Sequence, residues 1–356
     1  MRSQKLLSWA SWMASISVVM ISSAWLLAEL SSSPFINSLL VGAQNLPAFL
    51  PLKRSIKGFS SFLLATILLE LIVIFLYFDL TPNWLLIILT LGVALLASLG
   101  EQISLLPMTK ITLKRENIRN ELLQKSSDIG ELAGIIIGGA AYPYFKLFPP
   151  AILLALAPAW LSRRHTQVSR KQPHQKPEIP QSAPPLDFWC LLQGFCIGSL
   201  FALLPLWVIS VKDGTSLDFS FIFGAFMLGS IFASRLIPNL PIVGNYFLCT
   251  FLIFIAFLPL SPLWLDVIIF IPLGASITHI ELQLTDQLEK YGELSLRRDI
   301  LLRSQAVAAV FGSITMGIIG QVIGVTPAIL LVSLVYCLAG LVTWRWNQTT
   351  SGLSTN

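Results

Sequence analysis

Two carboxylates lie three residues apart in one of the most apolar stretches of the chain, SSDIGELAGIIIGG at residues 126–139. They are Asp128 and Glu131, and on a helix this spacing places both side chains on one face. Two carboxylates that close together in a dry environment do not both ionise, so their proton binding is coupled. The pair is therefore a candidate for reversible proton binding. The alternative is that both acids form ion pairs with basic side chains near the cytoplasm, such as Lys125.

Three further carboxylates, Glu70, Glu101 and Glu281, also fall within long apolar runs. A charge at the centre of a bilayer costs about 2.5–3.5 kcal/mol, so such residues are usually functional or shielded. His279 lies two residues before Glu281 and could relay protons with it. Residues two apart do not share a helix face, however, so a hydrogen-bonded structural histidine is the favoured alternative. We expect no metal site, because no second histidine and no cysteine lies nearby in an apolar run.

The composition identifies the elements that must position these residues. Of 356 residues, 55% are hydrophobic and 12% are charged, and the mean hydropathy is +0.76. Ordinary soluble domains contain about 25% charged residues, so these values indicate an all-α polytopic membrane protein. A helix needs about 20 apolar residues to cross a bilayer. This length predicts twelve transmembrane helices, over residues 6–28, 34–52, 58–78, 84–107, 121–143, 147–162, 187–210, 217–237, 241–261, 263–284, 301–323 and 326–346.

The positions of the basic residues predict the orientation of these helices. If both termini are cytoplasmic, 21 of the 23 Lys and Arg residues fall on the inner side, and only Lys146 and Lys212 fall outside. This asymmetry follows the positive-inside rule and indicates a multi-pass protein of a bacterial-type plasma (inner) membrane. The net charge of +5 therefore reflects topology, and nucleic-acid binding is not expected.

The chain also divides into two similar halves. Residues 163–186 are polar, basic and rich in proline, which predicts a cytoplasmic linker. It separates an N-terminal six-helix half (1–162) from a C-terminal six-helix half (187–346), which is followed by a cytoplasmic tail (347–356). A shift of 179 residues places the fifth helix on the eleventh and Gly138 on Gly317. Parallel repeats of six helices are typical of secondary transporters.

The second expected helix reads PFINSLLVGAQNLPAFLP, and the fifth contains four closely spaced glycines. With the six-helix repeat, these segments resemble the major facilitator superfamily. The second helix resembles that of efflux-type members, and the glycines resemble the antiporter motif GxxxGPxxGG. Ile135 stands where that motif has proline, and the loop LKRSIKGFSS lacks the usual GxxxDRxGRR signature. The eleventh helix is weakly similar to lysophospholipid-transporter-like members. The glycines that carry the resemblance are Gly130, Gly134, Gly138 and Gly139.

The resemblance implies a role for each expected helix. Helices one, four, seven and ten would line a central cavity, and helices two, five, eight and eleven would form the interface between the halves. The motif glycines would then permit close approach at that interface. Glu101 would pair with the basic loop after the second helix, or would couple to protons together with Asp128 and Glu131. The candidates for the substrate cavity are Trp12, Gln44, Asn45, Gln193, His279 and Glu281.

These features predict a secondary active transporter that works by alternating access. A cavity with aromatic, amide and acidic groups favours proton-coupled export, by antiport, of a small amphipathic or cationic solute. The expected partners are that solute, the lipid bilayer and a proton or other cation gradient, and family resemblance suggests a monomer. The sequence contains no ATP-binding GxxxxGK[ST] motif and no catalytic constellation, so we expect neither a cofactor nor an enzyme. The alternatives are a lysophospholipid or lipid carrier of the same fold and a transport-inactive scaffold or assembly factor.

Overall fold

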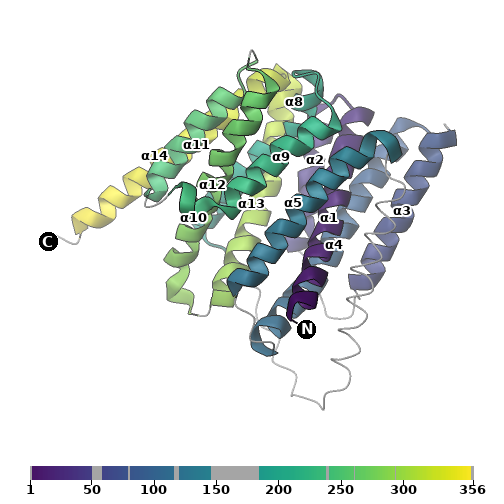
Figure 1. The fold of residues 1–356 in the computed structure, drawn as a ribbon. Coiled ribbons are helices and arrows are strands. Elements are labelled where there is room, and N and C mark those ends of the chain that lie inside the picture. Colours follow the sequence, from purple (N-terminus) through teal and green to yellow (C-terminus); the bar gives the residue numbers. More distant parts are fainter. Residues whose placement is uncertain are drawn as a thin grey trace. The chain divides into compact units, whose positions relative to one another are not determined.

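A computed structural model describes residues 2–49, 58–78, 81–115, 120–145, 184–237, 240–259, 261–292 and 294–353. The expected sixth helix, most of the expected linker and the basic loop after the second helix lie outside these residues. The described secondary structure is helical (Figure 1). Seven of the described helical segments are long and apolar enough to cross a membrane. The chain is therefore an integral, multi-pass membrane protein.

The helices that precede residue 146 form the first group. They are α1 (Arg2–Leu30), α2 (Pro34–Asn45), the short 3₁₀ helix η1 (Leu46–Phe49), α3 (Gly58–Phe78), α4 (Asn83–Arg115) and α5 (Asn120–Phe145). The second expected span is therefore α-helical only as far as Asn45 and then tightens into η1. Pro47 lies in η1, where its ring and missing N–H disfavour continuation of the α-helix.

The helices that follow residue 187 form the second group. They are α7 (Phe188–Ala202), α8 (Leu204–Ser210), α9 (Ser216–Ile231), α10 (Ala233–Leu236), α11 (Ile242–Ala256), α12 (Leu263–Gln287), η2 (Leu288–Tyr291), α13 (Leu294–Ile323) and α14 (Val325–Leu353). The seventh expected span is interrupted at Leu203, between α7 and α8. Pro205 at the start of α8 has no N–H with which to continue the hydrogen bonds of α7.

The contacts divide the chain into two compact units. One unit contains Met1–Ser31 and Ala43–Pro185, and the other contains Ser32–Gly42 and Leu186–Asn356. The first part of α2 therefore groups with the C-terminal residues, although the sequence placed all of the second span in the N-terminal half. Its packing on α13 explains this grouping, because a Cβ at Gly317 would overlap Ser38 and because Ser33 Oγ donates to Gln321 Oε1 at 2.7 Å.

Helix α5 lies beside α1 of the same unit (Figure 1), and three of its motif glycines, Gly130, Gly134 and Gly138, face α1. A Cβ at Gly134 would overlap the carbonyl oxygen of Ala14, and a Cβ at Gly130 would overlap that of Ala10. Backbones this close require a residue without a side chain. The sequence analysis assigned these glycines to an interface between the halves. The structure corrects this assignment, because their open face is occupied by α1.

The second unit contains a close helix pair of the same kind, formed by α7 and α13. Its first long helix, α7, packs along α13, the counterpart of α5 in the 179-residue repeat. Here two glycines lie on α7, where a Cβ at Gly194 would overlap the backbone of Gln305 and a Cβ at Gly198 would overlap that of Ala309. On α13, a Cβ at Gly312 would likewise overlap the backbone of Phe195. The close helix pair therefore occurs in both units, and in the second unit both helices supply glycines to it.

Candidate functional site

Glu281 is held by a side-chain amide from the neighbouring helix. It lies half-buried on α12, and its Oε1 accepts a hydrogen bond of 3.1 Å from Nε2 of Gln305 on α13. Arg298, two turns before Gln305, also interacts favourably with the carboxylate. An amide N–H can donate either to a carboxylate or to the carbonyl oxygen of a protonated carboxyl group. This contact therefore suits a group that gains and loses a proton.

His279 faces a different helix. Nδ2 of Asn245 on α11 lies 3.0 Å from Nδ1 of His279 and 3.1 Å from the carbonyl oxygen of Leu240. Because the amide nitrogen has only protons to offer, Nδ1 of His279 must accept, and the proton of the neutral ring is then on Nε2. The sequence left open a proton relay between His279 and Glu281. The structure separates the two side chains, because one contacts α11 and the other contacts α13.

Gln193 on α7 carries an uncompensated polar group. The residue is fully buried, and neither Oε1 nor Nε2 has a hydrogen-bond partner among the described residues. Its neighbour Gly194 packs directly against the backbone of Gln305, so Gln193 lies beside the helix contact that carries the Glu281 partner. Buried amides are normally satisfied by protein or water. Gln193 is therefore the described cavity candidate best placed to bind a polar group.

The candidate acids of the N-terminal unit lie near the packed face of α5. Asp128 and Glu131 are half-buried, and each takes part in a polar or electrostatic interaction. The preceding serines face α1, because Ser127 Oγ accepts from Trp9 Nε1 and Ser126 Oγ donates to the carbonyl oxygen of Leu6 at 2.6 Å. The two acids therefore stand at the edge of the α1–α5 contact.

Glu101 is half-buried on α4, and its expected basic partners in the loop after the second helix lie outside the described residues. Glu70 is half-buried on α3, and its buried Oε1 has no hydrogen-bond partner within the described part of the chain. The structure therefore offers no described ion pair that would explain either acid.

The remaining candidates of the N-terminal unit lie in helix contacts. Trp12 is 1% exposed and packs edge-on against Phe62 of α3, with ring centroids 5.9 Å apart. Gln44 donates from Nε2 to Met20 Sδ at 3.3 Å, and its carbonyl oxygen accepts from Ser98 Oγ. Asn45, the last residue of α2, is half-buried and also makes a polar or electrostatic contact. Trp12 and Gln44 thus contribute to packing within this unit.

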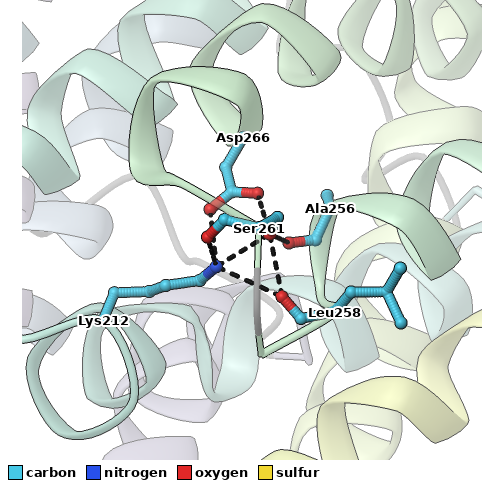
Figure 2. Close-up of polar contacts among 5 residues, drawn as sticks. All are labelled: Lys212, Ala256, Leu258, Ser261 and Asp266. Atoms are coloured by element: carbon cyan, nitrogen blue, oxygen red, sulfur yellow. Dashed lines mark hydrogen bonds and ion pairs between the residues drawn. The ribbon is translucent and has the colours of Figure 1, made fainter.

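The structure reveals one ionic cluster that the sequence analysis missed. Nζ of Lys212, in the connector between α8 and α9, lies 3.1 Å from Oδ2 of Asp266 in the first turn of α12 (Figure 2). Their side chains are 4% and 0% exposed. The sequence predicts Lys212 on the outer side of the membrane and gives no indication of a partner for it. The available signal was that Lys212 is one of only two basic residues that depart from the positive-inside distribution.

Comparisons with known proteins identify the fold. No family model and no curated protein sequence matches the chain. Similar solved structures include a mutant of the nucleoside transporter NupG, with a TM-score of 0.62 and 11% sequence identity over 96% of this chain and 98% of that one. A bacterial homologue of the human lysosomal transporter Spinster has a TM-score of 0.61 and 12% identity over 98% of this chain and 97% of that one. The chain has the major facilitator fold.

A further similar structure, a bacterial metal transporter, covers 94% of this chain and 98% of its own, with a TM-score of 0.58 and 12% identity. The all-α major facilitator fold inferred from the six-helix repeat, the second helix and the glycine motif is thus confirmed. Within the described residues, no group of three or more His, Cys, Asp and Glu side chains is placed to hold a metal ion.

Proposed function

We propose that the protein is a secondary transporter that works by alternating access and exports a small amphipathic cation in exchange for protons. The similarity of the whole chain to solved transporters of several substrate classes supports transport rather than catalysis. The carboxylates that fall within apolar runs, Glu281 among them, favour a cationic substrate over an anionic one.

The observation that carries the coupling proposal is the contact between Glu281 and Gln305. A carboxylate half-buried between α12 and α13 attracts either a proton or a positively charged substrate. One negative charge can be neutralised by only one of them at a time. Competition for Glu281 would therefore couple proton movement to the movement of the cation.

Asp128, Glu131 and Glu101 remain proposed proton-binding groups of the N-terminal unit. Gln193 would contact the substrate through its unsatisfied amide, which can both donate and accept hydrogen bonds. Alternating access would then expose these groups to each side of a bacterial-type inner membrane in turn, with the protein acting as a monomer.

The test uses proteoliposomes that contain a pH-sensitive dye. A proton gradient is imposed, and lipophilic cations, lysolipids and neutral amphipathic compounds are added in turn. The wild-type protein is compared with Glu281→Gln, with the double variant Asp128→Asn, Glu131→Gln, and with Glu289→Gln. Glu289 is the matched control, because it is an exposed glutamate on η2, a few residues beyond Glu281.

The proposal predicts proton flux that depends on a cationic compound, is lost in Glu281→Gln and survives in Glu289→Gln. Flux that survives in Glu281→Gln but disappears in the double variant would move the coupling site to α5. A response to lysolipids alone would instead support a lipid carrier. If no compound is bound or exchanged by any variant, the scaffold alternative gains support and transport is contradicted.

A further inference from the structure

Lys212 is surrounded by more oxygen atoms than it has N–H bonds. Its Nζ donates to Ser261 Oγ at 2.8 Å, to the carbonyl oxygen of Leu258 at 3.2 Å and to the carbonyl oxygen of Ser261, and it lies 3.1 Å from Oδ2 of Asp266. An ammonium group has three protons, so these four oxygens exceed the number of hydrogen bonds that it can make with good geometry. The oxygen atoms surround the ammonium nitrogen as they would surround a small bound cation (Figure 2).

The chemistry of these ligands is that of a site for a small monovalent cation. Carbonyl, hydroxyl and carboxylate oxygens are the ligands that hard cations prefer. The ring of Trp207 on α8, 4.9 Å from Nζ, adds an aromatic face that attracts cations. Ser261 completes the arrangement, because its hydroxyl accepts from Lys212 and lies 2.8 Å from Oδ1 of Asp266.

Asp266 makes a cation necessary at this position. The residue is fully buried, and among the described residues the ammonium of Lys212 is the only polar partner of its Oδ2. A buried carboxylate without a compensating charge is strongly destabilising. Whenever Lys212 is absent or neutral, another cation or a proton must take its place.

The local backbone builds the site from two connectors. Lys212 lies in the short turn between α8 and α9, where its own N–H donates to the carbonyl oxygen of Trp207. The carbonyl groups of Leu258 and Ser261 belong to the connector between α11 and α12, whose residues have left the helical hydrogen-bond pattern. The neighbouring Asp213 is exposed, so the connector that carries Lys212 borders the solvent.

We propose that this cluster is a monovalent-cation site in which the ammonium of Lys212 is the resident, tethered ion. Removal of the side chain opens the site to Na⁺, K⁺ or a small alkylammonium ion. The proposal is independent of the transported substrate and of the coupling role of Glu281. It assigns a ligand class to residues at the other end of α12 from that glutamate.

The test measures the thermal stability of the purified full-length protein in detergent. Wild type, Lys212→Ala and the double variant Lys212→Ala, Asp266→Ala are heated in choline, sodium, potassium or methylammonium chloride at equal ionic strength. Lys290→Ala is the control, because Lys290 also lies over an aromatic ring, that of Tyr291 at 5.0 Å, but is exposed. A bound cation raises the Tm in proportion to the logarithm of its concentration above Kd.

We expect Lys212→Ala to have a lowered Tm in choline that rises with methylammonium, Na⁺ or K⁺. Wild type, Lys290→Ala and the double variant should not distinguish these cations from choline. An equal response of Lys212→Ala to all four salts would overturn the proposal and leave Lys212 as a hydrogen-bonded structural lysine. If Lys212→Ala does not fold in choline, the Tm of Lys212→Gln is compared in the same four salts. Its amide keeps a hydrogen-bond donor without the charge. Failure of both variants to fold in every salt would also contradict the proposal.

Discussion

The side-chain nitrogen of Asn245 lies 3.0 Å from Nδ1 of His279 and joins α11 to α12 inside the C-terminal unit. The same nitrogen donates to the carbonyl oxygen of Leu240, which also accepts from Nε2 of Gln283 at 2.8 Å. The histidine is thus part of a network that connects two helices to the connector before α11. Its surroundings define it as a hydrogen-bond acceptor.

This network predicts energetic coupling between Asn245 and His279. Replacement of each residue by alanine, singly and together, should give a coupling free energy of unfolding of about 0.5–1.5 kcal/mol, the usual contribution of one hydrogen bond. Denaturant unfolding in detergent measures it. His279→Ala combined with Glu281→Ala should be additive, because these side chains contact different helices. Strong coupling between His279→Ala and Glu281→Ala would instead support a proton relay between these two side chains.

Gly134→Ala should destabilise the N-terminal unit. In a helix interior alanine is normally about 1 kcal/mol more favourable than glycine, but here the new Cβ overlaps the backbone of Ala14. Overpacking costs about 1–3 kcal/mol, which exceeds the gain in helix propensity. The substitution therefore lowers the stability of the unit, and the Tm falls. Gly92→Ala on α4 is the control, because its Cβ would lie an ordinary 3.7 Å from Leu68 Cδ1. An unchanged Tm for Gly134→Ala would show that α1 and α5 are not in backbone contact.

In choline chloride, Lys212→Met should reduce the free energy of unfolding by about 3–5 kcal/mol, because it removes the charge that compensates the buried Asp266. The double variant Lys212→Met, Asp266→Leu removes both charges and should recover much of this loss. Chemical denaturation of the three proteins at one pH measures the difference. If the double variant is less stable than Lys212→Met, the hydrogen bonds of Ser261 rather than the ion pair dominate the cluster.

Tyr142→Phe should lower the stability of the N-terminal unit by about 1 kcal/mol, the usual contribution of a single hydrogen bond. The phenol donates to Oε2 of Glu29 at 2.7 Å, while Trp25 donates to Oε1 of the same carboxylate at 2.8 Å. The bond from Tyr142 connects the end of α5 to the end of α1, and the bond from Trp25, within α1, holds the same carboxylate in place. Tyr144→Phe on the same helix is the control, because Tyr144 is 83% exposed. Equal Tm changes in the two variants would contradict a structural role for the Glu29 contact.

Part of the candidate site was readable from the sequence. Glu281 and Gln193 stand out as polar side chains in apolar runs, and their membrane location makes them costly unless they are used. Their partners could not be deduced, because helical periodicity states which residues share a face but does not state which helix covers that face. His279 and Glu281 are two residues apart in the chain and still contact different neighbours.

The sequence by itself determined that this is a helical, multi-pass membrane protein, and it predicted two six-helix halves. Within a bilayer each backbone group must be satisfied inside its own segment, so apolar length is enough to locate helices. Charge asymmetry predicts their orientation. Only the tertiary structure decided that the α5 glycines meet α1 and that Lys212 meets Asp266. These contacts join residues far apart in the chain through side-chain size and charge, and such complementarity exists only after the helices have packed.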